Sequence, residues 1–236
     1  MKKFIAIFIT SMIFYNGFTQ PLTGTKTIKK TGGDYSSFAS AITILNTKGV
    51  GTGGVTFNVD AGFIDTAANL VITDTTATAS NPIIFQKSGN GNNPLIIAKD
   101  GTGSMDGIIK ITGTDYITFD KIDLTESTKN TSANTRMEWG YALLKSASKN
   151  GCNYVVIKNC HITLNKSNTN ITYGIYSANH TITSVTDLIL SDTNECNSHN
   201  RFFSNSISNV SGGIYLVGSG SISSILFSLG LSTGAA

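Results

Sequence analysis

The sequence has few charged residues, few prolines and a single tryptophan. Asp, Glu, Lys and Arg make up 13% of its 236 residues, about half of their share in an average globular protein. A helical bundle or coiled coil, which would be rich in Glu, Lys and Arg, is therefore disfavoured. Three prolines are too few for a proline-rich linker. The surface must instead be built largely from Thr, Ser, Asn and Gly.

The chain also lacks an excess of charge of either sign. The 17 Lys and Arg residues fall to 15, against 14 Asp and Glu, when Lys2 and Lys3 of the N-terminal segment are left out. Nucleic-acid binding needs a basic surface, and no cluster of Lys and Arg is present. The sequence therefore indicates no nucleic-acid partner and no attraction to an anionic membrane surface.

Cysteine and histidine are scarce as well. Three cysteines, Cys152, Cys160 and Cys196, leave at least one thiol unpaired, and they form no Cys-x-x-Cys motif that would suggest zinc. We expect buried thiols that act as small hydrophobic residues. The three histidines, His161, His180 and His199, are 19 residues apart. They are expected at exposed polar positions, with His161 and His199 stacked on successive repeats, and no metal site is predicted.

The N-terminal segment has the three parts of a secretory signal peptide. Two lysines precede an apolar run over 4–14, and a polar stretch over 15–20 follows. The apolar run is too short to span a bilayer as a stable helix. The sequence therefore predicts a signal peptide over 1–20, cleaved after Thr19, and an exported protein that is extracellular or on the outer cell surface. No second long apolar run follows, so no transmembrane segment is expected in the mature chain.

A lead-in over 21–54 contains the one segment with a helical period. Phe38, Ala41, Ile42 and Leu45 share one helical face, so we expect a short amphipathic helix over 36–46. After Gly54 the pattern changes to short apolar runs that are separated by Gly, Asn, Asp, Ser and Pro, which is typical of an all-β chain. The expected strands are 55–60, 70–73, 83–86, 95–98 and 108–111.

An internal repeat gives the strongest indication of the fold. The segments DYITFDKIDLT (115–125) and NYVVIKNCHIT (153–163) align without gaps at an offset of 38. Apolar residues recur in both at i, i+2, i+5 and i+7, whereas a straight strand would keep a period of two. The extra residue, at 120–121 and 158–159, predicts a bend between two strands. A weaker copy is expected at 187–194.

A second element repeats ahead of each copy. Glycines followed by an apolar residue occur at Gly107, Gly140, Gly174 and Gly213, spaced 33, 34 and 39 residues apart. Three strands in every 33–39 residues predict a right-handed parallel β-helix of about five coils over 55–236, with the helix as its N-terminal cap, because stacked coils bury what one coil cannot. A β-sandwich is the alternative, but it gives no reason for a repeat in fixed register.

These residues resemble the pectin-lyase-like superfamily of parallel β-helix proteins. The segment GGDYSSFASAI (32–42) with VTFNVD (55–60) is similar to the start of its members, where a short helix caps the first coil, and the two repeat copies look like its coil consensus. With the lead-in LTGTKTI, the chain is similar to the N-terminal part of large secreted surface proteins of Bacteroidota-type bacteria. The resemblance implies the fold but no single activity, because the superfamily includes lyases, hydrolases and non-catalytic modules.

No catalytic cluster of that superfamily is present in the sequence. Its hydrolases carry closely spaced carboxylates, and here Asp120 and Asp123 are the pair that a bend would bring together. Its lyases need calcium-binding acids and a basic residue, and Arg136 and Arg201 are the only arginines. We therefore predict no catalytic residues and no cofactor. A polysaccharide lyase, with Ca²⁺, or a glycoside hydrolase is the alternative.

The predicted function is structural and binding, in the manner of an adhesin and directed to glycans. Trp139 and Tyr141, at the end of the long insert 127–140, are the predicted ligand-binding residues, because aromatic rings stack on sugars and solenoid loops commonly bind ligands. The expected partner is an extracellular polysaccharide or cell-surface glycan.

The C-terminal segment lacks charge. Residues 222–231 (ISSILFSLGL) are apolar and uncharged, whereas solenoids cover their last coil with a polar cap. We expect that the chain is truncated and self-associates through an uncapped last coil. The alternative is that 222–231 folds back as a final strand.

Overall fold

The structure, a computed structural model, describes residues 20–190, 192 and 195–218. The predicted signal peptide lies outside these residues except for Gln20, and the apolar segment 222–231 lies wholly outside them.

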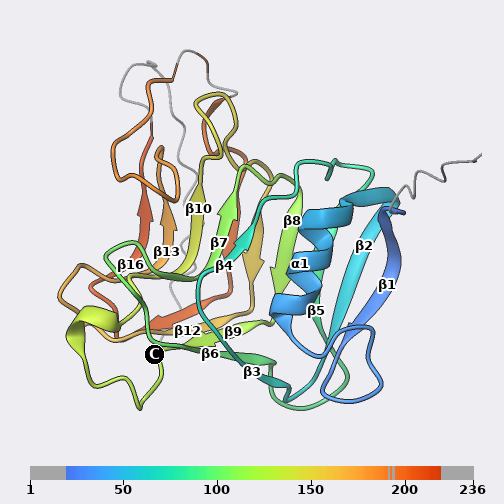
Figure 1. The fold of residues 1–236 in the computed structure, drawn as a ribbon, viewed down its shortest axis with the longest axis horizontal. Helices are drawn as coiled ribbons and strands as arrows, with labels where there is room; N and C mark the ends of the chain where they lie inside the picture. The colour runs from blue at the N-terminus through green and yellow to red at the C-terminus, as the bar shows by residue number, and fades with distance from the viewer. Residues whose placement is uncertain (1–19, 191, 193–194, 219–236) are drawn as a thin grey trace, which may run out of the picture.

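The regular secondary structure of the described chain is mostly β, in three parallel sheets (Figure 1). The sheets are named A, B and C. In the order of their hydrogen-bonded neighbours, sheet A contains β1 (Leu22–Ile28), β2 (Val50–Asp60), β5 (Ile83–Ser88), β8 (Ile117–Asp120), β11 (Val156–Lys158) and β14 (Arg201–Phe203). Sheet B contains β3 (Ile64–Ala67), β6 (Leu95–Ala98), β9 (Asp123–Thr125), β12 (His161–Thr163) and β15 (Ser206–Ser208). Sheet C contains β4 (Leu70–Ile72), β7 (Gly107–Thr112), β10 (Trp139–Leu144), β13 (Tyr173–Ser177) and β16 (Gly212–Leu216).

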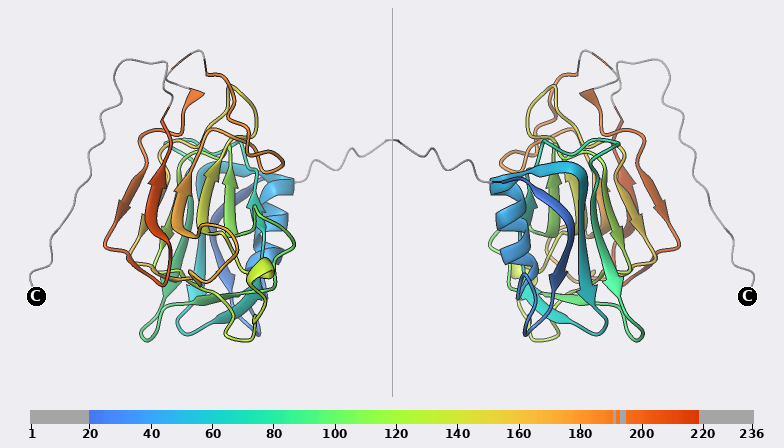
Figure 2. Two further views of the ribbon diagram at one scale, coloured as in Figure 1. Left: turned by 90° about the vertical axis from the view of Figure 1, so that its left-hand side faces the viewer. Right: turned by 90° about the vertical axis from the view of Figure 1, so that its right-hand side faces the viewer.

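From β2 onward the chain passes through sheets A, B and C in turn, so the described residues contain five coils of three strands. Figure 2 shows the strands of successive coils side by side, with the N-terminal strands at one end and the C-terminal strands at the other. Stacked parallel strands of this kind are consistent with a β-helix solenoid. The all-β prediction is confirmed.

The predicted repeat sets the register of sheets A and B. Thr118 pairs with Val156 and Leu124 with Ile162, which is the offset of 38 seen in the sequence. The predicted bends are present between β8 and β9 and between β11 and β12. Lys121 and Asn159 have φ values of 61° and 57° there, a left-handed conformation that asparagine tolerates better than most residues. The extra residue of the repeat therefore turns the chain from sheet A into sheet B.

The weaker copy predicted at 187–194 is wrong. The next copy is β14 and β15, because Val156 pairs with Arg201 and His161 with Ser206. Its offset is 45 residues. The copy was missed because several of its inward positions, which are apolar in the preceding coil, carry asparagine.

Four asparagines replace buried apolar residues in this last described coil. Asn197, Asn200, Asn205 and Asn209 each lie 45 residues after a residue that is at most 1% exposed, namely Cys152, Val155, Cys160 and Leu164. The amide oxygens of the first three accept the backbone N–H groups of Cys152, Val155 and Cys160 at 2.8, 2.8 and 3.0 Å. These side chains pair backbone groups at the corners, where the strand ladder is interrupted.

Three of the four repeated glycines occupy equivalent positions in sheet C. Gly140, Gly174 and Gly213 follow the paired residues Trp139, Tyr173 and Gly212. Gly107 pairs with Trp139 itself, so the predicted equivalence of Gly107 with Gly140 is wrong by one residue. A β-carbon on Gly140 would lie 2.5 Å from the carbonyl oxygen of Gly174. Glycine is therefore required at this close approach of the two coils.

The single α-helix, α1 (Phe38–Lys48), begins and ends two residues later than predicted. The Ser37 hydroxyl accepts the N–H of Ser40 as an N-cap, and the Gly49 N–H donates to Leu45 O at the other end. The predicted apolar face is buried. It packs against β1, β3 and β4, which are the first strands of the three sheets. α1 therefore covers the N-terminal end of the solenoid, as predicted.

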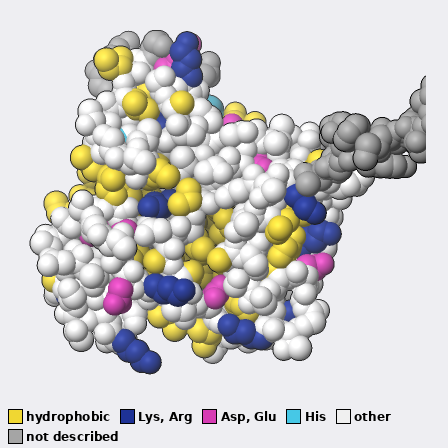
Figure 3. Space-filling view, in the orientation of Figure 1, with side chains coloured by type: hydrophobic (Ala, Val, Ile, Leu, Met, Phe, Trp, Pro, Cys, Tyr) yellow, Lys and Arg dark blue, Asp and Glu magenta, His cyan; other side chains and the backbone are white. Residues whose placement is uncertain are grey.

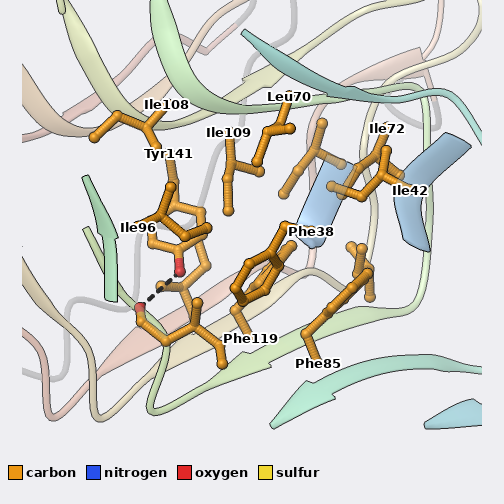
Figure 4. Packing of buried hydrophobic residues seen from close by; sticks show 14 of the residues in the cluster. Phe38, Ile42, Leu70, Ile72, Phe85, Ile96, Ile108, Ile109, Phe119 and Tyr141 are labelled. Carbon is orange, nitrogen blue, oxygen red and sulfur yellow. Dashed lines mark hydrogen bonds between the residues drawn. The ribbon is translucent and has the colours of Figure 1, made fainter. Parts of the chain in front are cut away.

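The core contains a row of phenylalanine rings (Figure 4). Phe57, Phe85 and Phe119 come from successive strands of sheet A and are wholly buried. Their centroids lie 4.5 and 5.2 Å apart with nearly parallel planes. Phe38 of α1 packs on Phe85 at 6.1 Å, which ties the helix to the core.

All three cysteines are free thiols, and Cys152 and Cys160 are buried, as predicted. Burial raises the pKa of Cys152 to about 12 and that of Cys160 to about 11, so neither forms an appreciable amount of thiolate at pH 8. We expect iodoacetamide at pH 8 to leave both unmodified in the native protein and to alkylate both in guanidinium. Peptide mass spectrometry checks this, with the partly buried Cys196 as the comparison. Modification of native Cys152 as fast as Cys196 would contradict the burial.

None of the helices in the described part of the chain has the length and apolar character that crossing a membrane requires.

Candidate functional site

A hollow of about 430 Å³ lies over the outer face of sheet B. The loop between β5 and β6 forms one wall with Gly91, Asn92 and Asn93, and strand residues form the floor. The floor residues are Leu95, Asp123 and His161.

The pleat of sheet B turns these floor residues outward. Leu95 pairs with Asp123, and the following residues of the strands, Ile96, Leu124 and Ile162, are at most 1% exposed. Successive residues of a strand point to opposite faces. The outward position of β6, β9 and β12 is therefore the same column on three successive coils.

Asp123 and His161 form a close pair in this hollow. The imidazole Nδ1 of His161 lies 3.0 Å from Asp123 Oδ2, and the backbone N–H of His161 donates to Asp123 Oδ1 at 2.8 Å. Asn93 Nδ2 donates to the same Oδ1 at 2.9 Å. The His161 side chain is 67% exposed and that of Asp123 16%. The carboxylate is thus held from two sides, while the imidazole reaches into solvent.

The two carboxylates expected to converge at the bend engage different partners. Asp120 accepts from Asn159 at 2.7 Å and forms an ion pair with Lys158 at 3.3 Å, whereas Asp123 is held by Asn93 and His161. Asp120 does not line the hollow. The bend therefore separates their roles, and Asp120 stabilises the stacking of β8 on β11.

The predicted ligand-binding aromatics lie at buried positions of β10. Tyr141 is 0% exposed, and its hydroxyl donates to Ile122 O at 2.9 Å, as Figure 4 shows. Trp139 is 4% exposed and stacks on Tyr176 with a centroid distance of 4.5 Å. Tyr141 offers no ring surface to a ligand, and Trp139 offers very little. The insert that precedes them is shorter than the one over 178–200 between β13 and β14.

Another set of rings lies at a corner of the solenoid. Tyr116 and Tyr154, at equivalent positions of two successive coils, stack with centroids 4.6 Å apart, and His199 stacks on Tyr154 at the same distance. A small hollow of about 160 Å³ lies beside them. Because the rings cover each other's faces, this corner offers a sugar ring little stacking surface.

His161 and His199 are exposed, as predicted, but the predicted stacking of these two and the predicted exposure of His180 are wrong. His199 stacks on Tyr154 rather than on His161, whose partner in the next coil is Ser206. His180 is 1% exposed, not an exposed polar residue, and Tyr176 Oη lies 2.8 Å from its Nε2. No group of three or more His, Cys, Asp or Glu side chains that could hold a metal ion is found among the described residues.

Buried acids directly before β7 and β10 of sheet C form a polar ladder between coils. Burial raises the pKa of Glu138, whose carboxylate accepts from the N–H of Asp106 and from Asn168 and Asn170. Burial opposes ionisation of Asp106 too, but hydrogen bonds from Asn69 and from backbone N–H groups outweigh it and lower the pKa of that carboxyl. These oxygens are used within the protein, so the ladder is structural.

The rest of the surface offers fewer features that could bind a ligand. On the face drawn in Figure 3, Lys and Arg side chains are scattered among neutral polar atoms, in agreement with the low charge. Sequence reasoning missed Asn93 and Leu95. The alignment of the two repeat copies already placed Asp123 and His161 at equivalent positions, but the hollow depends on how the loop over 89–94 folds.

Comparisons with models of known protein families, with curated proteins and with solved structures find nothing that matches this chain.

Proposed function

We propose that the chain is an exported module with a structural and glycan-binding role at the extracellular or outer cell surface, and that it is a right-handed parallel β-helix of the pectin-lyase-like kind. The signal-peptide pattern of 1–20 supports export, and the ladder of stacked coils supports a rigid scaffold. The right-handed sense follows the strong preference of parallel crossover connections.

The hollow beside Asp123 and His161 carries the binding proposal. Its volume, about 430 Å³, lies in the range of small-molecule sites. The lining combines the apolar side chain of Leu95 with amide, carboxylate and imidazole groups. A sugar ring presents the matching surfaces, an apolar C–H face and a rim of hydroxyls that both donate and accept hydrogen bonds.

Glycoside hydrolysis is less well supported. It needs two carboxyl groups about 5–10 Å apart around one bond, and Asp120 and Asp123 serve different partners. The lyase alternative has no specific observation in its favour. The geometry therefore supports binding over cleavage of the polysaccharide chain.

Binding is tested with purified protein on a panel of neutral and acidic polysaccharides. We expect Leu95→Ser to weaken the affinity about tenfold, equivalent to about 1.4 kcal/mol, because it removes the apolar floor of the hollow. Ile97→Ser is the matched control. Ile97 is also half-buried, points outward on the same strand and does not line the hollow. Equal losses in both variants, or no binding to any polysaccharide, would contradict the proposal.

A further inference from the structure

One outward column of sheet B carries an acid, an imidazole and a hydroxyl on three successive coils. Asp123 lies on β9, His161 on β12 and Ser206 on β15. The ladder pairs His161 directly with Ser206, and the side chain of Asp123 binds Nδ1 of His161. The order along the axis is therefore carboxylate, imidazole, hydroxyl.

We propose that Ser206, His161 and Asp123 form a nucleophile, base and orienting acid that hydrolyse acyl esters. This activity goes beyond glycan binding and does not depend on it. The same three groups recur on unrelated folds and are recognised by geometry rather than by sequence position. Here the solenoid supplies the geometry, because equivalent positions of stacked coils lie about 4.8 Å apart.

The hydrogen bond to Asp123 sets the tautomer of the neutral His161 imidazole. The carboxylate can only accept, so Nδ1 carries the proton and Nε2 is left as the basic nitrogen. Asn93 and the His161 N–H hold the other carboxylate oxygen, which keeps the acid in place.

Ser206 is exposed and lies on the side of His161 opposite to Asp123. Among the described residues no hydrogen bond joins its hydroxyl to Nε2. The role of nucleophile requires a rotation about the Cα–Cβ bond of Ser206 to a staggered rotamer that directs the hydroxyl toward the ring, and such contacts commonly tighten only when substrate is bound.

The chemistry then balances with water as the only co-reactant. His161 Nε2 takes the hydroxyl proton as Ser206 Oγ bonds to the ester carbonyl carbon, and the tetrahedral intermediate expels the alcohol, which takes that proton. Water adds to the acyl-serine while His161 accepts its proton, and Ser206 Oγ leaves and regains a proton as the carboxylic acid departs.

A backbone donor lies next to the nucleophile. The Ser206 N–H donates to Cys160 O at 2.9 Å, so the N–H of Ile207 points to the opposite side of β15. β15 is the outermost strand of sheet B in the described part of the chain. We assign the developing oxyanion to this N–H, a role that backbone amides commonly fill, and the leaving group to the hollow beside His161.

The test is covalent labelling of the full chain with a fluorophosphonate, in which Ser206 Oγ displaces fluoride from phosphorus. Peptide mass spectrometry should find the label on Ser206. Ser206→Ala should abolish it, and His161→Ala should slow it at least about 100-fold, the usual lower bound for a lost general base. The matched control is Ser208→Ala. Ser208 lies two residues on, is also exposed and bonds to Thr163, and its loss should leave labelling unchanged.

Asp123 is a positioning residue and is tested by the split between rate and binding. Asp123→Asn should lower the maximal labelling rate at saturating fluorophosphonate and leave the concentration for half-maximal rate unchanged. No label on Ser206, or equal labelling in His161→Ala, would overturn the proposal. A protein that binds polysaccharide but is not labelled would refute the triad alone, and the reverse result would refute the glycan proposal alone.

Discussion

Replacing Phe85 with alanine should lower the free energy of unfolding by about 3–5 kcal/mol. The ring lies between Phe57 and Phe119, at 4.5 and 5.2 Å, and Phe38 of α1 packs on it as well. Its removal leaves a cavity between three rings that are fixed by separate strands and a helix, so the neighbours cannot close it. Urea denaturation followed by far-UV circular dichroism measures the change.

Ile84→Ala is the matched control for this loss. Ile84 is the preceding residue of β5, and it points outward and is only half-buried. We expect a loss of about 1 kcal/mol. If the two variants unfold at the same urea concentration, the row of phenylalanine rings does not carry the stability assigned to it.

Gly140→Ala is expected to cost about 1–3 kcal/mol through overpacking. The added methyl group would lie 2.5 Å from the Gly174 carbonyl oxygen and 2.6 Å from Cγ2 of Ile162. The carbonyl belongs to a paired strand and cannot move without disturbing the ladder. The midpoint of thermal unfolding, measured by differential scanning calorimetry, should fall by several degrees.

Gly213 offers a control in the same column of sheet C. A β-carbon added there meets nothing within 4 Å among the described residues. Gly213→Ala should therefore leave the midpoint unchanged or raise it slightly, because alanine restricts the unfolded chain. A fall equal to that of Gly140→Ala would show that the close approach of the coils is not the cause.

The repeat was readable in the sequence because apolar residues mark the inward positions. The offset of 38 and the bends at Lys121 and Asn159 followed from that pattern, and so did the buried face of α1. The offset of 45 did not, because asparagine at inward positions reads as a loop. A polar residue that pairs backbone groups of the preceding coil leaves no hydrophobic period to detect.

The position of Tyr141 shows a different failure. The sequence places Tyr141 after a glycine, as it does Ile175 and Ile214, and the ladder confirms that the three residues share one column. An inward tyrosine was therefore predictable from the apolar residues at the equivalent positions. The prediction of a binding residue relied on the chemistry of the aromatic ring and not on the strand register. The hollow could not be predicted, because its wall is a loop whose path depends on tertiary contacts.

The change of inward residues along the solenoid also gives its assembly a direction. Each strand pairs only with the coil before it and the coil after it. Every new coil therefore pairs its strands with those of the coil formed before it. The first coils contain α1 and the phenylalanine rings, while the coil over 197–209 turns amides inward. A chain synthesised from its N-terminus completes the coils with apolar inward residues before the coil with inward amides, and the backbone groups of each later coil meet partners that are already in place.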